Sequence, residues 1–371
     1  MKILYIGHTY TVRANHAKIA ALAREPGVEI VLVTPPRWRG PLYNNTTDVF
    51  DASVAPNVVH KIVPAYFIGK ESGYFYGLAL FRIVRQFQPD IIHVEQGAYA
   101  LSYAQTLLAA QLFSPRSKSL FFTWWNLPYR LRGVKWMAER FNFTRSDVAI
   151  VGNNAARAIV QAHGFNGSIH ILPQLGIDYT ATNRTRNDED IFTIGYAGRI
   201  TKEKGVLDLI EAAARMQSKE SARLYFIGYG DALDESKRLA AYHGITFLHH
   251  APVRNDELPE HLAKMDVLIL PSRTTPQWVE QFGHILLEAM AAGVPVVGSS
   301  SGEIPNVIGD AGYVFPEGDV EGLAAQLDIL AVNQEEWQRL SQAGMLRVSR
   351  HFTNDIIAKK QIEIYRSVLA P

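Results

Sequence analysis

The stretch that decides the fold runs from Glu280 to Glu288 and reads EQFGHILLE. The residues from Gly283 onward are predicted to be helical, because small and apolar residues continue until GVP at 293–295 stops a helix. Eight residues of helix rise about 12 Å, whereas the carboxylate pairs that hydrolyse glycosides lie about 5 Å or up to about 9.5 Å apart. The two glutamates therefore suit opposite ends of a long polar ligand such as a sugar nucleotide. Its diphosphate would lie near the helix N-terminus, where free N–H groups and the dipole favour an anion.

The composition is that of a globular protein with two domains. The chain has 371 residues, 47% of them hydrophobic and 20% charged, and this length exceeds one ordinary core. A net charge of +1 gives no global bias towards nucleic acid. The absence of cysteine excludes disulfides, thiolate metal ligands and a cysteine nucleophile, and it fits a reducing compartment. Because MKILYIG reads as a strand rather than a signal peptide and no apolar run reaches about 18 residues, we expect a cytoplasmic protein.

The first half of the chain alternates short apolar strands with helical segments, as in a parallel sheet covered on both faces. The expected strands are 3–6, 29–33, 91–94, 120–123, 148–151 and 169–172. The expected helices are 15–23, 77–86, 101–112, 134–145 and 154–162. The polar, proline-rich stretch from Pro35 to Pro64 is predicted to be irregular.

A highly charged segment, Tyr179–Asp190, interrupts this alternation and is predicted to be a linker. A second series follows, with strands expected at 192–196, 223–227, 245–248, 267–270 and 295–298 and helices at 206–216, 233–242, 256–264 and from 283. The expected fold class is α/β, with two Rossmann-like doubly wound domains, 1–178 and 179–353, facing a central cleft. The apolar stripe of Asn354–Leu369 predicts a last helix, within 354–371, that returns to the first domain.

Two turns after strands are candidates for binding phosphate. The first reads GYAGRITKEKG, where Gly198 allows a tight turn and Arg199 and Lys204 supply a planar fork and a point charge for a diphosphate. The second is Gly228-Tyr229-Gly230. In isolation, surface charges and an ordinary strand–helix turn are the alternatives. The first turn lies one strand–helix unit into the second domain with the glutamate segment downstream, and this favours the phosphate site.

Together these segments resemble the GT-B retaining glycosyltransferases of family 4, the E-x7-E type. The resemblance rests on GYAGRITKEKG, FIGYGD and EQFGHILLEAMAAGVPVVGSSSGEIPNVIG, and it is strong over about 194–318. It implies a nucleotide-sugar site in the second domain and an acceptor site in the first. Arg199 and Lys204 would bind the diphosphate, Glu280 would face the transferred sugar and Glu288 would hold the ribose hydroxyls. The other donor-binding residues that it implies are Gly198, Gly228, Val253 in the base-binding loop, Phe282, and the backbone amides at Gly283, His284 and Ile285.

The first domain departs from the family pattern in two places. The loop after the first strand reads HTYTVRANH and has no glycine between Gly7 and Gly27. We expect Arg13 or Asn15 in this loop to contact phosphate or acceptor instead. Trp125-Asn126 stands where many members have a histidine that contacts the donor sugar.

Glu95 completes the expected catalytic set. It lies in HVEQG at a strand end and is predicted to orient the acceptor hydroxyl or to act as a base, with a surface carboxylate as the alternative. A cluster of aromatic and basic residues near the start of the helix expected at 134–145 suggests contact with an anionic membrane, with a partly buried helix that has a solvated basic face as the alternative. Its members are Trp124, Trp125, Tyr129, Arg130, Arg132, Lys135 and Trp136.

The function expected from the resemblance is metal-independent transfer of a hexose with retention of configuration. UDP-glucose is the first candidate donor and GDP-mannose the second, and the acceptor is a saccharide or lipid-linked saccharide in polysaccharide or glycolipid synthesis. A degenerate protein that binds a sugar nucleotide or a partner without transfer is the alternative, and a GT-B epimerase or phosphorylase also stays open. A nicotinamide-dependent dehydrogenase needs an early G-x-G-x-x-G, which the segment after Ile6 lacks.

Overall fold

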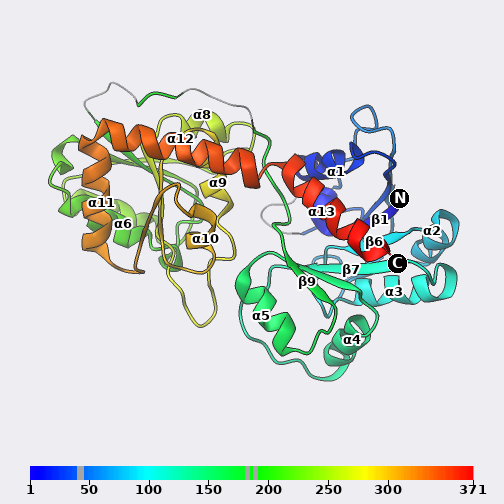
Figure 1. Cartoon of the computed structure of the whole chain (residues 1–371). Coiled ribbons are helices and arrows are strands. Elements are labelled where there is room, and N and C mark those ends of the chain that lie inside the picture. Colours follow the sequence, from blue (N-terminus) through cyan, green and yellow to red (C-terminus); the bar gives the residue numbers. More distant parts are fainter. Residues whose placement is uncertain (40–45, 180–183, 187–190, 371) are drawn as a thin grey trace. The chain divides into compact units, whose positions relative to one another are not determined.

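The computed structural model describes residues 1–39, 46–179, 184–186 and 191–370 (Figure 1). The chain divides into two compact units, one of Met1–Asp178 with Asn354–Pro371 and the other of Tyr179–Thr353. The predicted linker Tyr179–Asp190 lies mostly outside the described residues.

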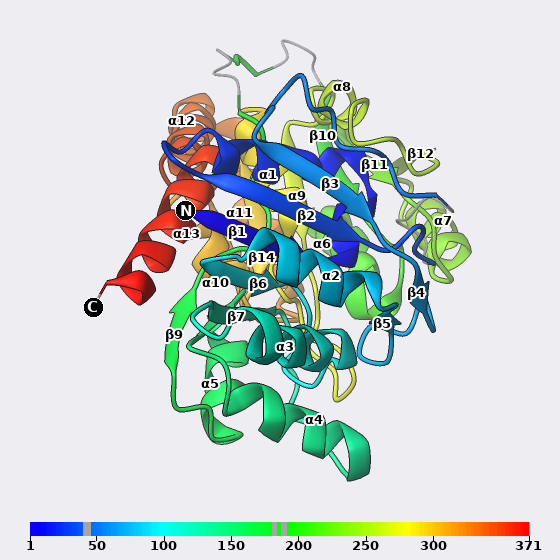
Figure 2. The same ribbon diagram turned by 90° about the vertical axis from the view of Figure 1, so that its right-hand side faces the viewer.

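The first unit is built on a seven-stranded parallel sheet (Figure 2). Its strands are β1 (Lys2–Ile6), β2 (Glu29–Thr34), β3 (Val58–Ile62), β6 (Ile91–Val94), β7 (Lys118–Thr123), β8 (Val148–Val151) and β9 (Ser168–Ile171). Their order is β3-β2-β1-β6-β7-β8-β9, so the direction of winding reverses between β1 and β6. Strands β4 (Ala65–Tyr66) and β5 (Phe75–Tyr76) form a separate antiparallel pair.

Helices cover both faces of this sheet because side chains of one strand alternate between the faces. Ile3 and Tyr5 of β1 pack in one core with α1 (His16–Ala23) and α13 (Asn354–Leu369). Leu4 and Ile6 pack in the other core. That second core contains side chains from α2 (Ala79–Phe87), α3 (Leu101–Phe113), α4 (Gly133–Phe143) and α5 (Asn154–Ala162).

The second unit repeats the plan with a six-stranded parallel sheet. Its strands are β10 (Phe192–Ala197), β11 (Ala222–Ile227), β12 (Thr246–His250), β13 (Val267–Leu270), β14 (Val296–Ser299) and β15 (Tyr313–Phe315). The order β12-β11-β10-β13-β14-β15 reverses between β10 and β13. Its α-helices are α6 (Val206–Arg215), α7 (Leu233–Tyr242), α8 (Leu258–Leu262), α9 (His284–Ala291), α10 (Ile304–Ile308), α11 (Val320–Val332) and α12 (Gln334–His351).

The predicted fold class is confirmed: the chain forms two doubly wound α/β domains, and its last helix packs in a core of the first. The prediction that 35–64 is irregular is wrong in part, because β3 (Val58–Ile62) lies within it. This strand is at the edge of the sheet and only Val58 is buried in it, so it lacks the continuous apolar run that marked the central strands. Helix α8 is also shorter than the predicted 256–264.

Candidate functional site

Most of the predicted site residues lie at the carboxyl edge of the second sheet. Gly198 and Arg199 follow β10, Gly228 follows β11, and Glu280 lies between β13 and α9. The reversal of strand order between β10 and β13 is the place where ligands bind in open α/β sheets, outside the carboxyl ends of the strands. The sheet therefore brings these loops together at a position suited to a ligand.

Two glycines bring the loops into direct contact. Gly205 has φ +67°, and a Cβ there would lie 1.8 Å from the carbonyl oxygen of Pro271, so only glycine lets the turn that contains Lys204 approach the end of β13. Gly302 has φ +54°, and its Cβ would lie 2.0 Å from the carbonyl oxygen of Glu280. The same carbonyl accepts a hydrogen bond from the N–H of Glu303 at 3.3 Å. The backbone of Glu280 is thus fixed against the loop after β14.

An ion pair between Lys204 and Glu280 forms the centre of this edge. The Lys204 ammonium lies 2.6 Å from Oε2 of Glu280, and the two side chains are only 14% and 9% exposed. The hydroxyl of the buried Ser272 donates to the same carboxylate oxygen at 2.9 Å. The ammonium also lies 4.3 Å from the centre of the Trp278 ring. Lys204, which is predicted to bind the diphosphate, and Glu280, which is predicted to bind the sugar, therefore form an ion pair with each other in this structure.

The sequence-based spacing of Glu280 and Glu288 needs correction. Helix α9 begins at His284, and Gly283 before it has the left-handed conformation with φ 85°. Glu280 consequently lies in a loop rather than in the helix, and the rise of eight helical residues does not describe the separation of the two carboxylates. Only Glu288 belongs to α9, where it is half-buried, and burial raises its pKa to about 7.

Three of the predicted donor-binding residues surround the start of α9. Phe282 is buried, and its ring centre lies 4.9 Å from that of His284. Burial lowers the pKa of His284 to about 4, so its imidazole is neutral at pH 7. His284 and Ile285 are the first residues of the helix, where backbone N–H groups lack intrahelical acceptors.

Arg199 and Val253 lie on the outer loops of the same sheet edge. Arg199 is exposed, and its backbone carbonyl accepts a hydrogen bond from the Tyr196 hydroxyl. Within the described part of the chain, the Arg199 guanidinium makes no ion pair. Val253 is half-buried in the loop after β12, and the N–H of Gly228 binds the carbonyl of His250 at 3.0 Å.

Glu95 belongs to the first unit and is buried, so the alternative of a surface carboxylate is wrong. Its Oε1 lies 2.8 Å from the Lys18 ammonium and accepts from the Tyr5 hydroxyl, and its Oε2 accepts from Gln174 at 2.7 Å. The Lys18 and Glu95 side chains are 1% and 0% exposed. Burial acts to raise the pKa of Glu95, but the charge of Lys18 and the surrounding hydrogen bonds outweigh it, and the pKa is lowered.

The loop without glycine after β1 is held by side chains. His8 stacks on the buried Trp38 with ring centres 4.1 Å apart and bonds Gln96 at 2.6 Å. The Asn15 amide donates to the carbonyl of Thr9 at 2.7 Å, so Asn15 closes the loop, whereas the Arg13 side chain is exposed.

The two tryptophans after β7 differ in their contacts and their exposure. The Trp124 indole donates to Gln174 at 2.7 Å, and a Cβ on Gly152 would lie 1.8 Å from the Trp124 ring. Trp125, which stands in place of the family's histidine, is 42% exposed.

Sequence reasoning missed Ser272 and Trp278, which contact the two members of the ion pair. Ser272 comes two residues after the apolar run of β13, and Trp278 comes two residues before Glu280. Their position between a buried strand and the glutamate segment is the signal that would have identified them.

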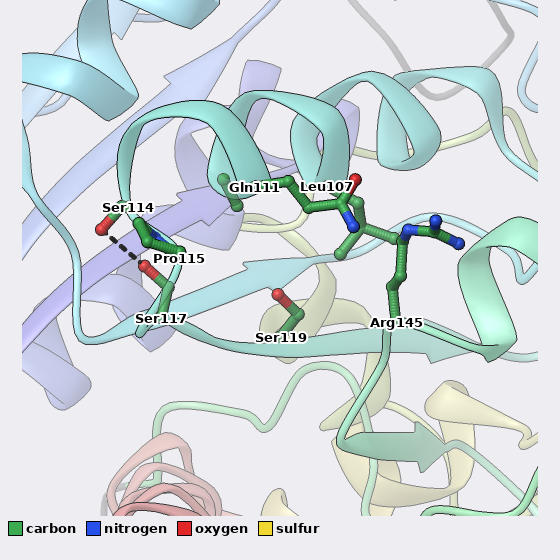
Figure 3. Close-up of a pocket in the computed structure, with 8 residues that line it drawn as sticks. Leu107, Gln111, Ser114, Pro115, Ser117, Ser119 and Arg145 are labelled. Atoms are coloured by element: carbon green, nitrogen blue, oxygen red, sulfur yellow. Dashed lines mark hydrogen bonds between the residues drawn. The ribbon is translucent and has the colours of Figure 1, made fainter.

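A separate cavity of about 380 Å³ lies in the first unit (Figure 3). It is lined by Leu107, Ala110, Gln111, Ser114, Pro115, Ser117, Ser119 and Arg145. The hydroxyls of Ser114 and Ser117 bond each other at 2.9 Å rather than pointing together at a ligand. None of the predicted site residues lines this cavity, and we assign it no role.

A family model matches the unit that contains the ion pair. Residues 180–347 match the model described as glycosyl transferases group 1. A curated relative, the sulfoquinovosyl transferase of Arabidopsis thaliana, is 26% identical over 308 residues, which is 77% of this chain and 58% of the relative. The chain spans about half the length of the curated relatives that it matches.

Solved structures resemble the whole chain. A glycosyltransferase from Rickettsia africae has a TM-score of 0.73 at 16% identity, over 99% of this chain and 98% of that chain. The Anabaena protein HepE, solved in complex with UDP-glucose, has a TM-score of 0.65 at 16% identity, over 99% and 100% of the two chains. The chain therefore has the GT-B fold. The fold, the family model and the curated relative together support the interpretation that the chain is a GT-B glycosyltransferase.

Proposed function

We propose that this chain transfers a hexose from a nucleoside-diphosphate sugar to a hydroxyl of a saccharide or lipid-linked acceptor, with retention of configuration and without a metal ion. The observation that carries the proposal is the Lys204–Glu280 pair at the point where the strand order of the second sheet reverses. A cation for phosphate and a carboxylate for sugar hydroxyls are the two groups that such a donor requires side by side. UDP-glucose is the first candidate donor and GDP-mannose the second.

In this scheme the second unit, 179–353, binds the donor and the first unit, 1–178, binds the acceptor. Arg199 and Lys204 bind the diphosphate, Glu280 accepts from hydroxyls of the transferred sugar, and Glu288 accepts from the ribose hydroxyls. Exposure of the Arg199 guanidinium supports its proposed role in binding the diphosphate, because the planar group is accessible to phosphate oxygens. The further donor contacts that we propose are Gly198, Gly228, Val253, Phe282 and the backbone amides at Gly283, His284 and Ile285.

The proposed reaction breaks the bond between the anomeric carbon of the sugar and the diphosphate oxygen. The acceptor oxygen attacks on the same face of the sugar, and the departing phosphate takes the proton of the acceptor hydroxyl. Arg199, Lys204 and the N-terminus of α9 stabilise the charge that develops on the leaving group.

Glu95 was expected to be catalytic, and its burial limits it to a positioning role. Both of its carboxylate oxygens already accept hydrogen bonds, from Tyr5 and Lys18 on one side and Gln174 on the other. We propose that it acts by orientation, through Gln174 and the adjoining Trp124, rather than by taking the acceptor's proton.

We further propose that the segment around α4 contacts an anionic membrane that carries the acceptor. All six residues from Arg132 to Met137 are exposed. Val134, Trp136 and Met137 are 67%, 49% and 62% exposed, and Arg130, Arg132 and Lys135 are exposed beside them. Apolar and basic side chains in and just before the first turns of one helix fit the interface of an anionic bilayer. Among the described residues, no helix is both long and apolar enough to cross a membrane.

Sedimentation with vesicles tests the membrane contact. We expect the protein to sediment with vesicles that contain phosphatidylglycerol and to lose this association when Arg130 and Arg132 are replaced by glutamate. Equal binding of the wild type and the charge-reversed variant would refute the contact.

A thermal-shift and calorimetric screen of UDP, GDP and ADP tests the ligand class. We expect one nucleotide to raise the melting temperature at millimolar concentration, and the corresponding sugar nucleotide to be hydrolysed slowly or transferred. A protein that binds none of the three does not have the proposed function. Tight binding without any hydrolysis or transfer would favour the non-catalytic alternative.

A further inference from the structure

We propose that Trp278 is a positioning residue of the donor site, and that the Lys204–Glu280 ion pair is exchanged when the donor binds. This inference rests on the proposed function. It adds how Lys204 and Glu280, which contact each other, become available to bind the donor. In this structure Glu280 and Trp278 both contact the Lys204 ammonium. The diphosphate then takes Lys204 away from Glu280, and the released carboxylate accepts from the hydroxyls of the sugar.

The contacts of Lys204 support this role of Trp278. The ammonium lies 2.6 Å from the Glu280 carboxylate and 4.3 Å from the centre of the Trp278 ring. An indole face attracts a cation more strongly than the other aromatic rings, and the attraction grows where water is excluded. Lys204 is only 14% exposed, so the ring acts on a poorly hydrated charge. The ring therefore restricts where the flexible lysine side chain places its charge.

The turn that contains Trp278 is itself fixed. The N–H of Thr275 donates to the carbonyl of Trp278 at 2.8 Å, which closes the turn. At its base the Thr274 hydroxyl and N–H both donate to Glu317 at 2.6 Å. Arg273 forms a two-bond ion pair with Asp208 of α6. Trp278 consequently has a rigid support from which to hold a neighbouring side chain.

The balance of charges favours a ligand that replaces both contacts of the ion pair over a ligand that binds Lys204 alone. A diphosphate attracts Lys204, but movement of the lysine leaves the Glu280 carboxylate, which is 9% exposed on its side chain, without its cation. A buried charge that loses its partner is strongly unfavourable. The hydroxyls of the transferred sugar in a complete donor replace the missing contact, whereas a free nucleoside diphosphate lacks this sugar. The pair therefore favours a sugar nucleotide over the nucleoside diphosphate alone.

Calorimetric titrations of UDP, UDP-glucose and inorganic pyrophosphate test the exchange. Glu280→Gln removes the carboxylate that competes for Lys204, so we expect its affinity for UDP and pyrophosphate to rise about threefold to tenfold, while its affinity for UDP-glucose no longer exceeds that for UDP. GDP and GDP-mannose replace the uridine pair if the nucleotide screen selects guanine. The matched control is Glu235→Gln, which breaks the exposed pair between Glu235 of α7 and Lys202, on the same turn as Lys204. It should change none of these affinities.

The role of Trp278 is tested by two variants of different chemistry. Trp278→Leu removes the ring face and should raise the KM for the donor about threefold to tenfold, as expected for loss of a partly desolvated cation–π contact. Trp278→Phe keeps a ring and should restore most of the loss, and kcat should change less than KM in both. Equal KM values for Trp278→Leu and the wild type would refute the positioning role.

The outcomes separate this inference from the proposed function. If UDP or GDP binds the wild type and Glu280→Gln binds it no better or more weakly, the exchange is refuted and the donor site stands. If the wild type and Glu280→Gln bind neither nucleotide nor pyrophosphate, the proposed function and the exchange both fail.

Discussion

Each unit has a lysine–glutamate pair at the carboxyl edge of its sheet, and the two pairs occupy matching places in the two domains. Lys18 lies on α1, the first α-helix after β1, and Glu95 follows β6, the strand beside β1 at the reversal. Lys204 lies just before α6, the first α-helix after β10, and Glu280 comes after β13, the strand beside β10. Each lysine also faces an aromatic ring, Tyr5 at 5.6 Å and Trp278 at 4.3 Å.

The pairs differ in how completely they are enclosed. The first has side chains that are 1% and 0% exposed, and Tyr5 and Gln174 occupy the remaining acceptor positions of Glu95. The second has side chains that are 14% and 9% exposed, and it lies among loops that glycines bring together. The difference indicates that the first pair fixes the fold around Glu95, from which Gln174 is positioned, whereas the second pair is the one that we propose a ligand can reach.

The largest expected effect concerns turnover at the second pair. The double variant Arg199→Ala/Lys204→Ala removes the two cations proposed to stabilise the leaving diphosphate. Loss of a single such group typically costs about 10²–10³ in rate, so we expect transfer or hydrolysis of the donor to fall by at least about a thousandfold, measured with purified protein at saturating donor. The circular dichroism spectrum serves as the folding control. Wild-type rates in this variant would refute the proposed mechanism.

The first pair should affect stability instead. Lys18→Met leaves the buried Glu95 carboxylate without its cation, and breaking such a pair costs about 3–5 kcal/mol. Urea unfolding followed by circular dichroism measures this loss. Lys18→Met/Glu95→Gln should recover part of it, and Lys204→Met should cost less because its site retains some contact with water. Equal losses for Lys18→Met and Lys204→Met would remove the distinction between the two pairs.

A smaller effect is a pH dependence of donor binding through Glu288. Burial raises the pKa of this carboxyl to about 7 from an ordinary value of 4.5. The carboxylate that accepts from ribose therefore forms as the pH rises through about 7, and we expect the affinity for UDP-glucose, which has no phosphate that titrates there, to rise about threefold between about pH 6 and 8. Glu288→Gln should remove this dependence.

The raised pKa of Glu288 affects the stability of the fold in the opposite direction to donor binding. The unfolded chain loses the Glu288 proton near pH 4.5, while the folded chain keeps it until about pH 7. Because the unfolded state binds fewer protons over this interval, the contribution of Glu288 makes stability fall as the pH rises through it. A Glu288→Gln variant whose stability and affinity both keep the wild-type pH dependence would show that this group is not responsible.

The smallest expected effect is at a third pair, in which Lys202, on the same turn as Lys204, contacts Glu235 of α7. Its two side chains are 70% and 42% exposed. Exposed pairs contribute about 0–1 kcal/mol. Glu235→Gln should change the free energy of unfolding by less than about 1 kcal/mol and leave turnover unchanged. A large loss of activity in this variant would indicate that charge near the turn, rather than enclosure of the pair, determines function.

The sequence was sufficient for the fold because the central strands carry continuous apolar runs, as in β6 and β13, and the last helix carries an apolar stripe. The edge strand β3 was not predictable in this way, because an exposed edge tolerates residues such as His60 and Lys61. The same reasoning located Arg199, Lys204, Glu280 and Glu288 as candidates, and their roles stay proposals.

Other features of the site depend on contacts between distant segments. The Lys204–Glu280 pair requires the approach of Gly205 to Pro271, which no local pattern specifies. Burial of Glu95 was not expected because charged side chains are rarely buried without a partner, and the partner here is 77 residues away in the chain. A lysine within the apolar run of α1, HAKIAALA, was the only local sign of it.

The most direct test of the account is a calorimetric titration of UDP-glucose, or of GDP-mannose if GDP is the selected nucleotide, into the wild type, Lys204→Met and Glu235→Gln. We predict equal affinities for the wild type and Glu235→Gln, and an affinity at least about tenfold weaker for Lys204→Met, because a charge-assisted contact to the diphosphate is lost. Unchanged affinity of Lys204→Met would contradict the claim that the second pair forms the donor site.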